Sequence, residues 1–246
     1  MTSSRTVLIT GGAGGIGRGL AERFHRLGDR VVMADRDQDA LTEASAATGG
    51  HGSAMDITDA ASVSAALAEV EAAHGPVDVL INNAGVLNRH GALVELDAAD
   101  MELILRTNVL GTFLVTQQVA QRMIASERAG VIVNISSIGG RQPTPGMGGY
   151  ESSKAAVDSL TRWAAIELAS HGIRVNAVAP GPVATAMLEL GMPEGSPQRE
   201  AWESRIPLRR LAAVADVAEA AAFLAGPGAA HLTGVSLPVD GGQLLT

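Results

Sequence analysis

The chain has 246 residues, of which 46% are hydrophobic and only 2% aromatic, and its formal net charge is −8. An acidic chain without a basic stripe argues against nucleic acid and anionic membranes as partners. The sequence contains no cysteine, which excludes disulfides, thiolate metal sites and cysteine nucleophiles. Its N-terminus has no signal-peptide pattern and no stretch approaches a membrane span, so we expect a cytoplasmic protein.

Short β-branched runs alternate with helical patterns throughout, which predicts crossover units and an α/β fold with a parallel sheet. Strands are predicted at 6–10, 30–35, 53–55, 77–81, 130–136, 173–178 and 235–239. Helices are predicted at 15–28, 37–47, 59–74, 100–126, 150–170 and 214–225. No linker interrupts the pattern, so residues 1–246 are expected to form a single domain. The irregular stretch 183–210 is interpreted as an insertion after the sixth strand, either a mobile lid or a surface loop.

A glycine-rich turn follows the first predicted strand and opens the first predicted helix. Glycines in this setting allow a tight turn and let backbone N–H groups approach a pyrophosphate at the positive end of the helix. The strand–turn–helix context therefore predicts a dinucleotide site. The residues expected to bind this part of the cofactor are Gly11, Gly14, Gly15, Ile16 and Gly17.

The second predicted strand ends at Asp35, about 20 residues past the glycines, where a carboxylate can accept hydrogen bonds from the ribose hydroxyls of NAD. A carboxylate there would also repel the 2′-phosphate of NADP. The adjacent Arg36 could pair with that phosphate, but the carboxylate carries more weight and NAD is the predicted cofactor.

Further candidate cofactor contacts follow the third and fourth predicted strands. Asp56 and Ile57 could border the adenine ring, although Asp56 could equally cap the helix that starts near Thr58. Asn83, Ala84 and Gly85 suit contact with the cofactor backbone or a turn. A common edge supports the whole set, since parallel sheets bind ligands at the carboxyl ends of their strands. The residues at that edge are Gly11, Asp35, Asp56, Asn82, Ser137 and Pro180.

The chain contains one tyrosine, Tyr150, and one lysine, Lys154, four positions apart. On a helix this spacing places both side chains on one face, one turn apart. A nearby positive charge favours the phenolate and lowers the pKa of a tyrosine, so the pair could act as an acid/base unit. Every other basic side chain is arginine or histidine, which indicates that this position needs a compact ammonium group.

The ordered motifs resemble the short-chain dehydrogenase/reductase family over nearly the whole chain. They are Thr10-Gly-x-x-x-Gly-x-Gly17, Asn82-Asn-Ala-Gly85, Asn108, Ser137, Tyr150-x-x-x-Lys154, Pro180-Gly181 and Val239-Asp-Gly-Gly242. The resemblance implies a doubly wound Rossmann fold, a seven-stranded parallel sheet with helices on both faces, and hydride transfer between an alcohol and a carbonyl.

The resemblance also implies roles for individual residues. Tyr150 would be the general acid/base, and Lys154 would lower its pKa and bind the nicotinamide ribose. Ser137, rather than Ser136, would bind the substrate oxygen, and Asn108 would hold a water near Lys154. The expected nicotinamide loop contains Pro180, Gly181, Val183 and Thr185.

The predicted reaction is oxidation of a secondary alcohol, a polyol or a cyclic alcohol with NAD, or the reverse reduction. The alternatives are an NADPH-dependent 3-oxoacyl thioester reductase and a dinucleotide-binding sensor without turnover. No metal site is expected, and His90 is interpreted as a solvent-facing loop residue rather than a pocket residue. Excess apolar surface on helices 100–126 and 150–170 indicates subunit contacts, and the resemblance implies a homotetramer.

Overall fold

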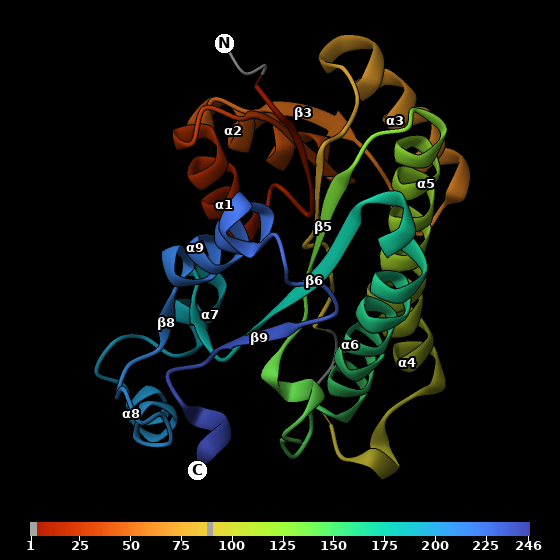
Figure 1. Ribbon diagram of the computed structural model, residues 1–246. Helices are drawn as coiled ribbons and strands as arrows, with labels where there is room; N and C mark the ends of the chain where they lie inside the picture. Colours follow the sequence, from red (N-terminus) through yellow and green to blue (C-terminus); the bar gives the residue numbers. More distant parts are fainter. Residues whose placement is uncertain (1–3, 88–90) are drawn as a thin grey trace.

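Seven parallel strands form one sheet in the computed structural model, which describes residues 4–87 and 91–246 (Figure 1). The spatial order is β3-β2-β1-β4-β5-β6-β9, and every neighbouring pair is parallel. The strands are β1 (Thr6–Thr10), β2 (Arg30–Asp35), β3 (His51–Ala54), β4 (Val79–Asn82), β5 (Gly130–Ile135), β6 (Ile173–Pro180) and β9 (Ser236–Val239). The predicted doubly wound α/β fold is confirmed, and predicted strand ends differ by at most two residues.

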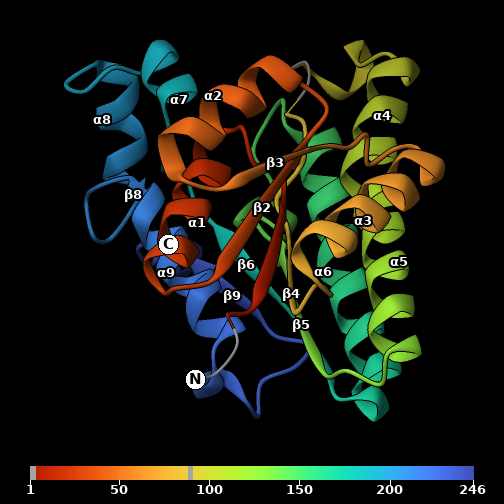
Figure 2. The ribbon, with the colours of Figure 1, turned by 90° about the horizontal axis from the view of Figure 1, so that it is seen from above.

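Helices cover both faces of the sheet (Figures 1 and 2). One face carries α1 (Gly15–Arg26), α2 (Gln38–Thr48) and α9 (Val214–Ala225); the other carries α3 (Ala60–His74), α4 (Ala98–Leu105), α5 (Thr112–Ala125) and α6 (Gly148–Leu168). Because both faces are covered, the central strands are apolar without alternation and every residue of β1 is buried. Two hydrophobic cores result, one around Phe24 and one around Leu67.

The predicted helix 100–126 is interrupted, which the sequence pattern did not indicate. A π-helical turn, η2 (Arg106–Gly111), separates α4 from α5. Two long-range contacts occur there. A Cβ on Gly111 would lie 2.6 Å from Cδ1 of Ile57, and the Asn108 side chain bonds the backbone of Val86. These contacts are made with residues distant in sequence, and the apolar periodicity of a single helix carries no information about them. Such π-helical turns are frequent at functional sites.

The stretch 183–210 is more regular than expected. It contains β7 (Val183–Ala184), α7 (Ala186–Gly191) and α8 (Pro197–Ser204), and β7 pairs with β8 (Ala212–Ala213). Both helices begin with a hydroxyl cap: Thr185 accepts from the N–H of Leu188, and Ser196 accepts from the N–H of Arg199. Ser196 before Pro197 is a start signal that was visible in the sequence.

Short 3₁₀ turns complete the chain, namely η1 (Leu93–Glu95), η3 (Ile138–Gly140), η4 (Ala169–His171), η5 (Pro227–Ala229) and η6 (Gln243–Leu245). The interpretation of His90 lies outside the described residues. Within residues 4–87 and 91–246, no helix has both the length and the apolar character needed to cross a bilayer.

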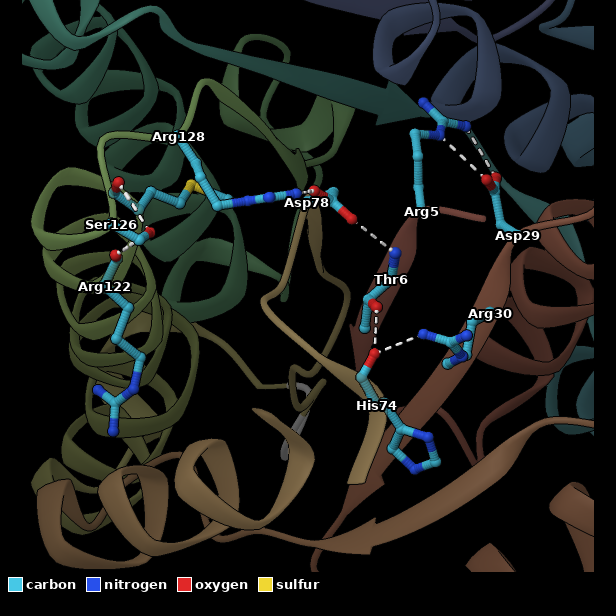
Figure 3. A network of polar contacts seen from close by, with 10 residues as sticks. Arg5, Thr6, Asp29, Arg30, His74, Asp78, Arg122, Ser126 and Arg128 are labelled. Atoms are coloured by element: carbon cyan, nitrogen blue, oxygen red, sulfur yellow. Dashed lines mark hydrogen bonds and ion pairs between the residues drawn. The ribbon is translucent and has the colours of Figure 1, made fainter. Parts of the chain in front are cut away.

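A polar network fastens the amino-terminal ends of the strands (Figure 3). The Asp78 carboxylate accepts from the N–H of Thr6 at 2.8 Å and forms an ion pair with Arg128. Arg5 makes two hydrogen bonds to Asp29, at 3.0 and 2.8 Å. These contacts link segments that are far apart in sequence, so they hold neighbouring strands together at the edge of the sheet opposite the carboxyl ends.

Candidate active site

A cavity of about 450 Å³ lies at the carboxyl ends of the strands, where the strand order reverses between β1 and β4. Such a reversal is where open parallel sheets bind ligands. The cavity brings together twelve residues predicted from the sequence: Gly11, Gly14, Gly15, Ile16, Asp35, Arg36, Asp56, Ile57, Asn83, Ala84, Gly85 and Thr185. The sequence interpretation missed six further lining residues, Ala34, Met55, Thr58, Val86, Thr107 and Ala186. Each of the six lies next to a predicted site residue in the sequence, and this adjacency was the signal that could have identified them.

The glycine turn is held by the end of β4. The Thr10 hydroxyl accepts from the N–H groups of Asn83 and Ala84, each at 3.1 Å. Gly11 has a φ of +63°, and a Cβ there would lie 2.7 Å from Cα of Ala84, so only glycine fits. Helix α1 begins without a side-chain cap and without an acidic residue in its first turn. Its free N–H groups and positive dipole therefore suit an anionic group in the cavity.

Some predicted cofactor residues do not line this cavity. A Cβ on Gly17 would lie 2.2 Å from the carbonyl oxygen of Gly11, so Gly17 allows close packing within the turn. Pro180, Gly181 and Val183 lie at and after the end of β6 but outside the cavity lining, whereas Thr185 from the same loop lines it.

Two carboxylates, Asp35 and Asp56, line the cavity. Asp35 accepts from the N–H groups of Ala13 at 3.2 Å and Asp37 at 3.3 Å. Asp56 accepts from the N–H and hydroxyl of Thr58, and these bonds, with smaller contributions from Arg36 and Arg106, lower the pKa of Asp56. The N-cap of α3 is Asp59. Asp56 therefore forms a local turn and lines the cavity, and its alternative role as a helix cap is not observed.

Tyr150 and Lys154 lie on one face of α6, with the Lys154 ammonium 5.6 Å from the centroid of the Tyr150 ring. The end of β5 brings Ser137 to the phenol, which it meets through a side-chain hydrogen bond. Ser136 points elsewhere: it is buried and its hydroxyl donates to the carbonyl of Lys154 at 3.2 Å. The choice of Ser137 over Ser136 therefore agrees with the geometry.

The net shift of the Tyr150 pKa is upward in this structure, and Lys154 is not among its causes. Burial raises the pKa of Tyr150 above 10.0; the hydrogen bond from Ser137 opposes the rise and the charge of Glu151 adds to it. The Lys154 ammonium instead donates to the carbonyl of Ile135 at 2.8 Å. Burial also lowers the pKa of Lys154 from 10.5 to about 8, against the opposing charge of Asp158.

Asn108 is fully bonded and 1% exposed. Its side-chain oxygen accepts from the N–H of Val86 at 2.8 Å, and its amide donates to the carbonyl of Val86 and to the hydroxyl of Ser153. The Ser153 hydroxyl in turn donates to the carbonyl of Tyr150 at 2.6 Å. The side chain thus ties the loop after β4 to the helix of Tyr150.

A second cavity, of about 960 Å³, includes Tyr150 in its lining. Its other described residues come mainly from 143–152 and from the apolar side chains Leu96, Met101 and Ile104. Tyr150 therefore borders an apolar space on one side and the Ser137 hydroxyl on another. The described residues contain no group of three or more metal-ligating side chains that could hold an ion.

These residues fit a bound dinucleotide. The uncapped start of α1 and the glycines that bring backbone close to the cavity suit its diphosphate, and the carboxylate of Asp35 in the cavity lining suits its adenosine ribose.

The chain is also similar to known dehydrogenases and reductases. A family model described as enoyl-(acyl carrier protein) reductase matches residues 11–243. The galactitol 2-dehydrogenase (L-tagatose-forming) of Cereibacter sphaeroides is 40% identical over 95% of this chain and 92% of its own length.

Two solved structures are similar throughout. A 3-ketoacyl-(acyl-carrier-protein) reductase from Brucella melitensis complexed with NADH has a TM-score of 0.89 at 35% identity, covering 97% of this chain and 98% of its own. A structure of ElxO with NADP bound has a TM-score of 0.91 at 34% identity, covering 99% of this chain and 100% of its own. Fold, motif order and these similarities together establish that the chain belongs to the short-chain dehydrogenase/reductase family of oxidoreductases.

Proposed function

We propose that this chain is an NAD(H)-dependent oxidoreductase that interconverts a secondary alcohol, in particular a polyol or cyclic alcohol, and its ketone. The observation that carries the proposal is that Tyr150 lies with Ser137 and Lys154. A Cβ on Gly85 would lie 3.6 Å from the Lys154 nitrogen, and Gly85 lines the same cavity as Asp35. The similarity to a galactitol 2-dehydrogenase supports a polyol as substrate.

In this proposal the protein supplies one proton, orientation and charge stabilisation. The residues that line the 450 Å³ cavity would hold a nicotinamide dinucleotide, which would supply the hydride chemistry. Tyr150 gives a proton to the carbonyl oxygen during reduction and takes it back during oxidation. Ser137 donates a hydrogen bond to the same oxygen and stabilises charge that develops there. The raised Tyr150 pKa keeps the phenol protonated and ready for reduction, so oxidation is expected to accelerate as the pH rises.

Asp35 supports NAD rather than NADP. Its carboxylate lines the cavity and would accept from ribose hydroxyls, while a 2′-phosphate beside it would be repelled. Arg36 lines the same cavity, so some use of NADP is compatible with the site.

A 3-oxoacyl thioester reductase is the second candidate, favoured by the similarity to the 3-ketoacyl-(acyl-carrier-protein) reductase. A dinucleotide sensor without turnover would have no need for Tyr150, Ser137 and Lys154 together, and this combination argues against it.

We further propose that copies of the chain associate through α5 and α6. Trp163 is 49% and Ile166 79% exposed on α6, and Phe113 of α5 stacks on Trp163 at 6.0 Å. Apolar surface of this extent supports a homo-oligomer, and a homotetramer is the expected form.

The test is formation of NADH from NAD, with NADP in parallel, on galactitol and on secondary and cyclic alcohols. We expect NAD-dependent oxidation that disappears in Tyr150→Phe. Activity confined to NADPH and a 3-oxoacyl thioester would establish the second candidate instead. Retained NADH binding without turnover on any substrate would identify the non-catalytic binder.

A further inference from the structure

The segment 138–147 connects the two residues that meet at the phenol. It leaves Ser137 through the turn η3 and returns to α6 at Gly148, two residues before Tyr150. Its second half lines the 960 Å³ cavity beside Tyr150. The position of this segment on α6 therefore determines both the placement of Ser137 and the shape of one cavity wall.

Glu151 holds the segment at Thr144. Its carboxylate is 5% exposed, and both of its oxygens accept from the backbone N–H of Thr144, at 2.8 and 2.9 Å. A carboxylate in the first turn of a helix is favoured by the helix dipole. Burying it next to a phenol is nevertheless costly, because a buried charge loses its hydration.

Asp158, two turns further along α6, holds the segment at Arg141. It is also 5% exposed, pairs with the guanidinium of Arg141 at 3.4 Å and accepts from the hydroxyl of Ser236 at 2.8 Å. Arg141 also donates to the carbonyl of Ser236 at 2.7 Å. One buried carboxylate thus joins the segment to both α6 and β9.

Between the two carboxylates the segment lies directly on the helix. A Cβ on Gly140 would lie 2.8 Å from the backbone nitrogen of Ala155, and one on Gly139 would lie 2.9 Å from Cγ of Glu151. At Gly140 the two backbones are in direct contact, and at Gly139 the segment packs on the Glu151 side chain. A loss of either anchor would therefore be transmitted to Ser137.

We propose that Glu151 and Asp158 are positioning residues, two buried carboxylates seven residues apart on α6 that hold segment 138–147 against the helix and thereby place Ser137 and the cavity wall relative to Tyr150. The functional part of this inference rests on the proposed oxidoreductase activity.

The groups that face Tyr150 make the two anchors distinguishable. Ser137 faces the phenol from the end of β5, and Glu151 and Lys154 do so from α6 itself. The side chains of Leu96, Met101 and Ile104 that pack against this turn of α6 are apolar. Because the charge of Glu151 opposes formation of the phenolate, only the anchor at Glu151 should alter the titration of Tyr150.

The experiment compares Glu151→Gln and Asp158→Asn with the control Glu219→Gln. Glu219 lies on α9, and its carboxylate forms an ion pair with Arg23 of α1. Tyr150 is the only tyrosine, so the near-ultraviolet absorbance of phenolate reports its ionisation without any substrate. Circular dichroism at each pH verifies that the chain remains folded. Hydrogen exchange, read by mass spectrometry on peptides from 138–147, reports the hold on the segment.

We expect faster exchange over 138–147 in both site variants, and a Tyr150 titration at lower pH in Glu151→Gln but not in the control. Unchanged exchange in both site variants would overturn the proposal. Faster exchange with an unaltered Tyr150 titration in Glu151→Gln would still support the hold on the segment, and the kinetic comparison would then decide whether that hold positions Ser137.

Kinetics with galactitol and NAD supply the functional arm. We expect kcat to fall about 10- to 100-fold in both site variants while the KM for NAD stays the same, because misplaced reacting groups slow chemistry. Equal kcat values in wild type and both variants would overturn the role in positioning. If the wild type oxidises no alcohol, the proposed function fails, whereas titration and exchange still decide whether the anchors exist.

Discussion

Charged side chains lie at both the amino-terminal and the carboxyl ends of the strands, but their partners differ between the two. At the amino-terminal edge, Asp78 pairs with Arg128 and Asp29 pairs with Arg5 (Figure 3). At the carboxyl edge, Asp35 accepts from backbone N–H groups while lining a cavity, and Lys154 is buried against a carbonyl. Charges that satisfy one another stabilise the fold, whereas charges that face a cavity reduce stability and favour a ligand.

Removing the phenol should have the largest effect. Tyr150→Phe is expected to lower kcat about 10³-fold, because a positioned general acid or base contributes roughly 10²- to 10⁴-fold. NADH binding, followed by fluorescence, should remain. Turnover near the wild-type value would remove Tyr150 from the acid/base role.

Lys154→Met should change activity and stability in opposite directions, lowering turnover and raising the stability of the fold at neutral pH. The lowering of the Lys154 pKa from 10.5 to about 8 corresponds to about 3 kcal/mol against burying the ammonium group. That cost is fully present below pH 8 and disappears as the pH rises toward 10.5. At neutral pH the variant should therefore resist urea better. Its turnover should fall about 100-fold, because the cation beside the Tyr150 ring is removed. A variant less stable than wild type would show that the Ile135 hydrogen bond outweighs the burial cost.

Asp35→Ser tests the role of the Asp35 carboxylate in the lining of the 450 Å³ cavity. We expect the KM for NAD to rise about tenfold, because a charge-assisted hydrogen bond of roughly 1.5 kcal/mol or more is lost. The ratio of kcat/KM for NADP to that for NAD should rise in parallel. An unchanged ratio would mean that Asp35 does not contact the adenosine ribose.

Asp78→Ala, at the amino-terminal ends of the strands, should lower the stability of the fold and leave the activity unchanged. It removes the partner of Arg128 and leaves the N–H of Thr6 without its acceptor, so unfolding in urea should cost about 1–3 kcal/mol less. Activity per folded molecule should match wild type. A large loss of kcat with normal stability would contradict the division between the two edges.

His74 should give the smallest effect. Burial, together with the charges of His51 and Arg30, lowers the pKa of His74 below 6.5. The unfolded chain then binds the proton more readily, so this contribution to stability is present above pH 6.5 and is lost as the pH falls. His74→Gln should flatten the dependence of the urea midpoint on pH between neutral and mildly acidic solution. An identical dependence in both proteins would assign it to other groups.

Most of the element order was predictable because it is local. Alternating β-branched and amphipathic runs, with glycine between the first strand and helix, fix which segments are strands and helices. The π-helical turn at Arg106–Gly111 was not predictable, since Asn108 and Gly111 make their contacts there with residues distant in sequence. The helices α7 and α8 were missed although Ser196-Pro197 carried a start signal.

The sequence alone predicted the fold class, the ends of the strands where the cavity lies, and the Tyr150–Lys154 pair; the family resemblance added Asn108 and Ser137 to the predicted catalytic set. Periodicity and motif spacing are properties of neighbouring residues and can be read without coordinates. Only the tertiary structure decided the partners of those residues: Asn108 bonds Val86, Lys154 meets Ile135, and Glu151 holds Thr144. The physical reason is that hydrogen-bond partners and pKa shifts depend on burial and on contacts between separate segments, which form only when the chain packs.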